Sequence, residues 1–408
     1  MTANDPTPSW PAFTLGEDPL EALVKLSRHY GSLPGFVIAG GGNTSVKDAA
    51  TLYVKASGVP LASIARDGFV SLDRARLQAL GETECSADPA TREGQFKQAI
   101  LAARRAPECG RRPSVEALLH HLLPARFVVH SHATLVNAVA CCVNGRKIAR
   151  ELFGDDALWI PYVDPGYVLA RTLRQMLAAR GTGAPKILLM ANHGLIVSGD
   201  SPDDIRGTTD RVIARIRARL GDHWRQAPFG PAAVADPGLI GTITNALPCL
   251  LAESDRLPVI TFDDSPLVGS FVSGDAAATL PFNGPLNPDQ IVYCNSFPLH
   301  FAPEAGESSP TLIDRLRGAV AGHRTRHGYL PRVILVRGVG LFAAGNDPKM
   351  AATARDLYKD AIEILAGAAH LGGPTYLSDP HRAFIEQWEA EAYRRQIASG
   401  SAARPTAM

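Results

Sequence analysis

The sequence FVVHSHATLVNAVA occupies residues 127–140, and its apolar start leads directly into two histidines. The apolar start predicts a short β-strand over 127–130. On a strand, alternate side chains point to the same face, so the imidazoles of His130 and His132 can reach one ion. The small and apolar residues that follow, up to residue 142, predict a packed helix.

A second stretch, KILLMANHGLIVSG at residues 186–199, places a third histidine at the end of an apolar strand. Gly194 follows His193 and allows a sharp change of direction before the next apolar run. Three imidazoles on one ion leave an open coordination position, which suits a catalytic zinc acting as a Lewis acid. The alternative is that these are ordinary loop histidines at strand ends. The third histidine weakens this alternative without removing it.

Glu116 is the candidate catalytic base. The sequence PSVE at 113–116 places its carboxylate in the first turn of a helix predicted over 114–123. A carboxylate in that place can accept a proton in general base catalysis. The alternative is structural, because the helix macrodipole favours an acidic residue at this position, and spacing alone favours that alternative.

Four further histidines lack the context of a strand end. His120 and His121 are neighbours in the helix predicted after Pro113, where adjacent side chains point apart. His323 and His327 are expected on the surface. We therefore assign structural roles to all four.

The sequence GGGNTS at residues 40–45 follows an apolar segment, 36–39, that we expect to be a short strand. A glycine-rich loop after a strand exposes backbone amides that suit an oxyanion such as phosphate. The loop matches neither the Walker sequence nor the dinucleotide-binding fingerprint. A plain tight turn is the more common explanation of such glycines, so the motif alone gives weak support for a phosphate site.

Composition and charge exclude several classes of function. The chain has 408 residues, which suggests two or three domains at roughly 150 residues each. Its net charge of +1 does not indicate the strongly basic surface that is typical of a nucleic-acid binder. No apolar stretch approaches the ~20 residues of a membrane span. The N-terminus lacks a signal-peptide pattern and no Cys-x-x-Cys pair occurs, so we expect a cytoplasmic protein with reduced thiols and no nucleic-acid or membrane partner.

Shifts in composition divide the chain into four segments. Residues 1–18 are rich in Pro, Asp and Thr and are expected to form an N-terminal arm, and a linker rich in Pro, Ala and Gly lies near 227–237. The metal-binding domain is then expected over 19–226, and a second domain over 238–375. The remaining residues, 376–408, are expected to form a C-terminal amphipathic helix and a tail.

The second domain contains a weak echo of the first. The sequence ILVRGVGLF at 334–342 matches the pattern of residues 187–196, and a helix is expected after each. The segment 291–295 would then occupy the position of residues 128–132. The three histidines are replaced in this alignment by Tyr293, Asn295 and Val339. Since valine cannot bind a metal, we predict a degenerate, metal-free second copy.

Five motifs follow one another in the order GGGNTSVKD, VKASG, PSVE, VVHSHATLVNAVA and NHGLIVSGD. Together, over about residues 36–215, they resemble the class II aldolase/adducin family. The resemblance is closest to the aldolase part of bifunctional rhamnulose-1-phosphate aldolase/alcohol dehydrogenase proteins. It implies an α/β fold with three layers, α/β/α, in which a largely antiparallel central sheet lies between helical layers. The degenerate second copy would follow this domain.

The resemblance also implies roles for individual residues. The family's three metal ligands correspond to His130, His132 and His193, with zinc or another divalent cation as the metal. Its catalytic base, which approaches the metal when no substrate is bound, corresponds to Glu116. Its phosphate-binding positions correspond to Asn43, Ser57, Gly58 and Ser114. Its aromatic proton donor, often supplied by a neighbouring subunit, corresponds to Tyr162, with Tyr167 as an alternative.

The activity implied by the resemblance is that of a class II, metal-dependent aldehyde-lyase. Such an enzyme cleaves a ketose 1-phosphate to dihydroxyacetone phosphate and an aldehyde through a metal-stabilised enediolate. Three alternatives remain open, namely a sugar-phosphate epimerase, a decarboxylase of the same family, and a non-catalytic adducin-like module. The expected partner is a small sugar phosphate, and the expected assembly is a homo-oligomer, either a dimer or a tetramer.

Overall fold

The computed structural model describes residues 8–106, 110–181, 183–222, 224–226, 228–253, 256–390 and 393. These residues divide into two compact units, one made of residues 8–140 and 145–216 and the other of residues 141–144 and 217–393. The segment boundaries inferred from composition stay predictions. Residues 1–7 of the predicted arm and 394–408 of the predicted tail lie outside the described residues. Among the described residues, no helix is both long and apolar enough to cross a membrane.

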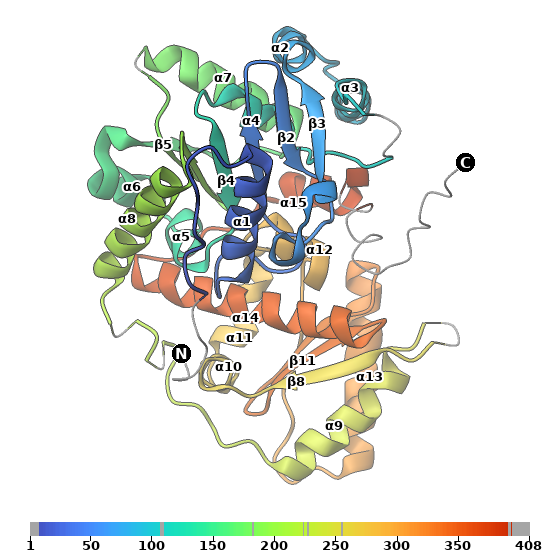
Figure 1. Cartoon of the computed structure of the whole chain (residues 1–408). Helices are drawn as coiled ribbons and strands as arrows, with labels where there is room; N and C mark the ends of the chain where they lie inside the picture. Colours follow the sequence, from blue (N-terminus) through green and yellow to red (C-terminus); the bar gives the residue numbers. More distant parts are fainter. Residues whose placement is uncertain are drawn as a thin grey trace. The chain divides into compact units, whose positions relative to one another are not determined.

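The first unit is a sheet covered by helices on both faces (Figure 1). Its elements, in chain order, are α1 Pro19–Ser32, β1 Asn43–Lys47, β2 Thr51–Lys55, β3 Phe69–Asp73, α2 Arg74–Glu82, α3 Pro89–Ala102, α4 Ala117–Leu122, β4 Phe127–Ser131, α5 Thr134–Ala140, α6 Gly145–Phe153, β5 Ala157–Ile160, α7 Tyr167–Arg180, β6 Ile187–Met190, β7 Gly194–Gly199 and α8 Pro202–Leu220.

The sheet of the first unit has seven strands in the order β3-β2-β1-β4-β7-β6-β5. All neighbouring strands are antiparallel except β5 and β6, which are parallel. The prediction of a largely antiparallel central sheet is therefore confirmed. Strand β4, which carries two of the candidate ligands at its end, lies in the middle of the sheet between β1 and β7.

The two faces of this sheet are buried by different helices, because successive strand residues point to opposite sides. Val128, Leu188 and Ile196 face a core formed with side chains of α2, α3, α4 and α7. Their neighbours Val129 and Val197 are buried on the other face, where α1 packs on β1 and β4, and α5 packs on β6 and β7. The three layers predicted from the family resemblance are present.

The second unit has a smaller sheet of four strands, in the order β8-β11-β10-β9. Its elements are α9 Pro237–Leu250, β8 Val259–Asp263, α10 Pro266–Ser273, α11 Ala276–Thr279, α12 Pro288–Cys294, β9 Leu299–Phe301, α13 Ser309–His327, β10 Val333–Val336, β11 Gly340–Gly345, α14 Pro348–His370 and α15 Asp379–Gln387. Helices α9 and α13 pack together over one core of this sheet, and α14 packs against β8 and β11.

The second sheet repeats one half of the first. Strands β8, β11, β10 and β9 have the same order and directions as β4, β7, β6 and β5, including the parallel pair at the end. The turns agree as well, since Val339 N donates to Val336 O at 3.0 Å and His193 N donates to Met190 O at 3.2 Å. Among the described residues, the second sheet contains no counterpart of β1, β2 or β3.

One part of the predicted echo is wrong. Residues 291–295 were expected to occupy the position of β4, but Ile291 and Val292 lie in helix α12. Asn287 begins this helix by accepting a hydrogen bond from Gln290 N at 2.9 Å, and Pro288 occupies its first turn, where proline is favoured. A short apolar run does not distinguish a strand from a buried helix. The topology instead identifies β8 as the counterpart of β4.

A second correction concerns the glycine-rich segment. Residues 36–39 were expected to be a strand, but they form no strand, and Ala39 has a left-handed backbone with φ of 52°. Strand β1 begins only at Asn43. The glycines therefore precede β1, and Gly42 needs its missing side chain because a Cβ there would lie 2.7 Å from His130 O.

Candidate metal centre

The third candidate ligand lies in the tight turn between β6 and β7. Asn192 has a left-handed backbone with φ of 52°, which asparagine tolerates better than most residues, and His193 follows it. Gly194 then begins β7 beside the end of β4. A Cβ at Gly194 would lie 2.4 Å from Ser131 O and 3.2 Å from ring atoms of His130 and His132. Glycine is therefore what allows the turn to approach the two other histidines.

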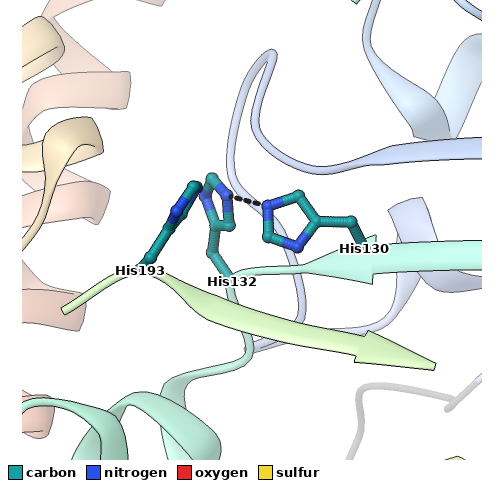
Figure 2. Close-up of side chains that lie close together, drawn as sticks. All are labelled: His130, His132 and His193. Atoms are coloured by element: carbon teal, nitrogen blue, oxygen red, sulfur yellow. Dashed lines mark hydrogen bonds between the residues drawn. The ribbon is translucent and has the colours of Figure 1, made fainter. Parts of the chain in front are cut away.

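The three imidazoles converge where β4 ends and β7 begins (Figure 2). The nitrogens that each histidine offers as a ligand all lie within 4.8 Å of one another. Nε2 of His130 and Nε2 of His132 are 3.0 Å apart. His130 is fully buried, and His193 is 7% exposed. The structure therefore brings together the three residues that the sequence proposed as ligands.

The hydrogen bonds around these rings fit a divalent cation. Nδ1 of His130 lies 3.0 Å from Leu195 O, which can only accept, so Nδ1 carries the proton and Nε2 keeps its lone pair. The carbonyl of His132 accepts from Asn137 Nδ2 at 3.3 Å, which fixes the backbone beside the second ligand. Backbone carbonyls that orient ligand histidines are a common feature of metal sites. The ligand set is one that catalytic zinc prefers.

Glu116 lies against the same nitrogens. Its Oε2 is 3.5 Å from Nε2 of His130, and its Oε1 is 3.3 Å from Nε2 of His193. Glu116 is at the N-cap position of α4, but its side chain makes no capping hydrogen bond. The carboxylate therefore contacts the histidines and not the backbone amides of the helix end.

The charge state of this cluster follows from its burial and its neighbours. Burial acts to raise the pKa of Glu116, but His130, His193 and the Asn43 amide outweigh it and lower the pKa to about 2. Burial lowers the pKa of His130 to about 3, in spite of the nearby Glu116 carboxylate. An ionised carboxylate beside neutral imidazoles is the state in which both kinds of group can bind a cation.

Asn43 joins β1 to this cluster. It pairs with His130 across β1 and β4, and its Nδ2 donates to Glu116 Oε2 at 2.6 Å. Its Oδ1 accepts from Nε2 of His120, a fully buried residue that we assigned a structural role from the sequence. His120 is therefore part of the candidate site. The Glu-x-x-x-His spacing could have indicated this, because residues four apart share a helix face.

Two other predicted phosphate-binding residues lie on adjacent backbone segments. Ser57 N donates to Arg112 O at 2.8 Å, and Ser114 N donates to Lys55 O at 2.9 Å. Ser114 Oγ accepts from Glu116 N at 3.3 Å, which links this pair to the residue of the carboxylate. The remaining predicted residue, Gly58, has φ of 82° and is buried.

Lys55 is a residue that the sequence analysis missed. It is 2% exposed, and its ammonium donates to Gly40 O at 3.1 Å and to Val59 O at 2.9 Å. One buried cation thus holds the glycine-rich segment and the segment after β2 together.

Two tyrosines were candidates for the proton donor, and the structure separates them. The hydroxyl of Tyr167 donates to Thr83 O at 3.3 Å and accepts from Cys85 N at 3.2 Å, and its ring belongs to the core under α2 and α7. Tyr167 is thus engaged in packing. Tyr162 follows β5, whose last residue, Ile160, pairs with Met190 at the end of β6. Its role stays a prediction.

The second unit has different side chains at the corresponding positions. His130 pairs with Ile196, and Phe262 pairs with the equivalent residue, Phe342. By this register, the counterparts of the three histidines are Phe262, Asp264 and Val339. The earlier assignment of Tyr293 and Asn295 is wrong, because both follow from the misplaced strand. Val339 is confirmed as the counterpart of His193.

Two family models match the chain. The model described as "Class II Aldolase and Adducin N-terminal domain" matches residues 21–213. The model described as "Aldolase class II, second domain" matches residues 317–394. The first match contains every candidate ligand and the candidate base, and the second lies largely within the second unit.

Individual proteins give weaker similarities. The chain is 26% identical over 416 residues to the "Uncharacterized oxidoreductase YuxG" of Bacillus subtilis (strain 168), a match that covers 93% of this chain. The chain spans 58% of the length of that relative. A solved N-terminal class II aldolase domain from Thermoplasma acidophilum is 26% identical, with a TM-score of 0.45 and coverage of 52% of this chain and 97% of that one. An L-fuculose-1-phosphate aldolase from Thermus thermophilus is 15% identical, with a TM-score of 0.32 and coverage of 49% and 92%.

Proposed function

This chain belongs to the class II aldolase and adducin family, and on that premise we propose that it is a zinc-dependent aldehyde-lyase. The proposed reaction is cleavage of a ketose 1-phosphate to dihydroxyacetone phosphate and an aldehyde. One observation carries the proposal. Three histidine ligand nitrogens lie within 4.8 Å of one another, and the Glu116 carboxylate is within 3.5 Å of two of the rings.

His130, His132 and His193 would hold the cation. When bound, a divalent cation supplies Lewis-acid stabilisation of the negative charge that develops on the substrate oxygens as the carbon–carbon bond breaks. The protein fixes the ligand geometry through Leu195 O and Asn137 Nδ2. Since both contacts involve the chain itself, the ring of His130 and the backbone of His132 are held in place before any substrate arrives.

Glu116 is the proposed base. One oxygen, Oε2, accepts from the Asn43 amide, while Oε1 accepts no hydrogen bond from any described residue. That oxygen is therefore able to take a proton from the substrate and to return one to carbon after cleavage. In the direction of synthesis, Tyr162 is the proposed proton donor to the aldehyde oxygen, which becomes the new hydroxyl; on cleavage that hydroxyl gives up its proton.

The proposed phosphate site is built from Asn43, Ser57, Gly58 and Ser114. Lys55 supports this assignment, because its buried ammonium contacts the segment that precedes β1 and the segment that follows β2. A phosphate bound there would hold the substrate while the bond beyond it is broken. Holding the reacting groups in the right geometry can remove a large part of the activation barrier.

Product analysis tests the proposal directly. The purified protein is incubated with a panel of ketose phosphates and with dihydroxyacetone phosphate plus a series of aldehydes, and the products are identified by NMR. We expect dihydroxyacetone phosphate and an aldehyde in one direction, and a new ketose phosphate in the other. Formation of a stereoisomer without free aldehyde would establish an epimerase instead, and release of carbon dioxide a decarboxylase.

A non-catalytic adducin-like module is the alternative from a different class. All three candidate ligands and Glu116 are retained in this chain, which favours an enzyme. Metal analysis of the purified protein separates the two. One equivalent of zinc per chain is expected for the enzyme, and a protein that binds no divalent metal would contradict it.

We also propose that the chain forms a homo-oligomer. The second unit repeats half of the first sheet, so a dimer would contain four related sheets. Light scattering coupled to size-exclusion chromatography measures the mass in solution. A mass of two or four chains is expected, and a monomer at all concentrations would refute the proposal.

A further inference from the structure

Strand β1 and the start of helix α4 place polar side chains next to one another on one face of the first sheet. Asn43, Ser45 and Lys47 alternate along β1, so their side chains point to the same side. Glu116 and His120 are one helical turn apart at the start of α4, and they also share a face. The two periodicities bring these five polar residues into one row, which is buried throughout.

A single hydrogen-bonded chain runs through this row. Ser45 Oγ lies 2.7 Å from Nδ1 of His120, and Nε2 of His120 contacts Asn43 Oδ1. Asn43 Nδ2 then donates to Glu116 Oε2 at 2.6 Å. The backbone carbonyl of His120 also accepts from Lys47 Nζ at 2.6 Å, which fixes the helix at this residue.

The chemistry of these groups sets the direction of the hydrogen bonds. Asn43 Oδ1 can only accept, so Nε2 of His120 must carry a proton. Burial lowers the pKa of His120 to about 3, so the ring is neutral and Nδ1 accepts from the hydroxyl of Ser45. Every donor in the chain then points toward the Glu116 carboxylate, and bonds aligned in this way strengthen one another.

We propose that His120 is a positioning residue for the candidate base, because its Nε2–H tautomer fixes the Asn43 amide with Nδ2 turned toward Glu116. The reversed amide would place Oδ1 against a carboxylate oxygen, and it would leave Nε2–H of His120 facing another donor. With this tautomer, His120 on one side and the Glu116 carboxylate on the other favour the same orientation of Asn43. That orientation holds Oε2 of Glu116 in place and leaves Oε1 beside His193.

The expected effect of His120 on turnover rests on the proposed function, whereas the expected proton on its Nε2 does not. Two variants separate the two ring nitrogens, since the side-chain nitrogen of glutamine lies near the position of Nε2 and that of asparagine near the position of Nδ1. His120→Gln retains a donor to Asn43, and His120→Asn loses it. His121→Asn is the matched control, because His121 lies next in α4 and contacts Gln78 instead.

Steady-state kinetics on zinc-loaded protein gives the first test. We expect kcat of His120→Asn to fall by about 10- to 100-fold, as for other residues that orient a catalytic group, with bound zinc and thermal midpoint close to those of His120→Gln. His120→Gln should recover at least roughly a third of the wild-type kcat, because the donor to Asn43 is restored. Equal losses in the two variants would overturn the proposal, since a packing role does not distinguish the two nitrogens.

NMR of histidine labelled with ¹⁵N gives the second test, on metal-free protein and without any reaction. The signal absent from His120→Gln identifies His120 in the wild type. We expect a protonated Nε2 and an unprotonated Nδ1 across neutral pH. A proton on Nδ1 with none on Nε2 would overturn the proposal even if the aldolase activity is found. The expected tautomer without any lyase activity would instead count against the proposed function and leave the positioning of Asn43 intact.

Discussion

The turn between β6 and β7 and the turn between β10 and β11 have the same backbone but different chemistry. Each is closed by the same hydrogen bond, with His193 N as donor in the first unit and Val339 N in the second. Each is followed by a glycine that begins the next strand. The first turn presents a ligand nitrogen, and the second presents only an apolar side chain. This backbone therefore supports the site but does not create it.

The glycines after the two turns show how closely the units correspond. A Cβ at Gly194 would approach Ser131 O and the ligand rings. A Cβ at Gly340 would approach Asp263 O at 2.7 Å and the ring of Phe262 at 2.6 Å. The backbone oxygen and the side chain that each glycine meets occupy equivalent positions. In the second unit, the space taken by His130 is filled by a phenylalanine whose ring centroid lies 4.7 Å from that of Phe342.

The units also differ in what lies beside the central strand. In the first, β1 lies next to β4 and carries the polar row that contains Asn43 and Ser45. In the second, β8 is the edge strand of the sheet among the described residues. The ligands thus come from the half of the sheet that is repeated, whereas Asn43, which donates a hydrogen bond to the base, comes from the half that is not.

The largest effect should follow from removing a ligand in the first unit. His130→Ala is expected to abolish zinc binding and to lower kcat/KM on the order of 10³- to 10⁵-fold, because the metal supplies several kcal/mol of charge stabilisation. Metal analysis and the lyase assay measure both quantities. The control is Asp264→Ala at an exposed position of the second unit that corresponds to a ligand, which should keep one zinc per chain. A His130→Ala protein with full activity and no metal would refute the assignment.

A smaller loss should follow from changing the base and not the ligands. Glu116→Gln is expected to keep the zinc and to lower kcat by about 10²- to 10⁴-fold, as is usual for general bases. No described residue of the second unit corresponds to this role, so all of the activity should depend on the first. Comparing zinc content with turnover for the same preparation checks this. Loss of the metal together with activity would show that Glu116 is needed for binding instead.

The two glycines allow the comparison to be tested directly. Gly194→Ala and Gly340→Ala should each lower the free energy of unfolding by roughly 1–3 kcal/mol, because both introduce a Cβ into occupied space. Only Gly194→Ala should weaken zinc binding, since its Cβ would displace His130 and His132. Urea unfolding and zinc titration of both variants measure these effects. Equal zinc affinities in the two variants would contradict the inference that Gly194 must lack a side chain to lie beside His130 and His132.

The last expected effect concerns pH. Burial lowers the pKa of Lys47 in the folded protein to about 7, from an ordinary value of 10.5. Between these values the unfolded chain binds a proton that the folded chain has released, so the free energy of unfolding should rise with pH. Below pH 7 the cost of the buried charge is fully present. Lys47→Met should remove this slope, and urea unfolding from pH 7 to 10 tests it. If the free energy of unfolding rose with pH equally in the wild type and in Lys47→Met, Lys47 would not be the cause of the pH dependence.

The sequence predicted the elements whose residues carry their own signal. A helix was expected after residues 187–196, and α8 runs there from Pro202 to Leu220, because proline is favoured in the first turn and the apolar period continues to the end. The strands before His130 and His193 were equally clear, since β-branched and aliphatic runs lead into each histidine. Three ligand candidates followed from these strand ends alone.

What the sequence did not predict depends on pairings between distant segments. The role of His120 exists only because α4 lies over β1, and no local pattern specifies that contact. The start of β1 was missed because Ala39 adopts a left-handed backbone that its residue type does not favour. The residues 291–295 were misplaced because the choice between strand and helix was made by Asn287 and Pro288, which lie outside the matched pattern.

The central place of β4 has a consequence for synthesis of the chain. The candidate centre gathers residues from Asn43 to His193, and β4 contacts both β1 and β7. A growing chain from which β7 has not yet emerged has two of the three ligands and no closed coordination shell. The complete set of ligands therefore exists only after nearly half of the polypeptide has been synthesised and has paired across the sheet.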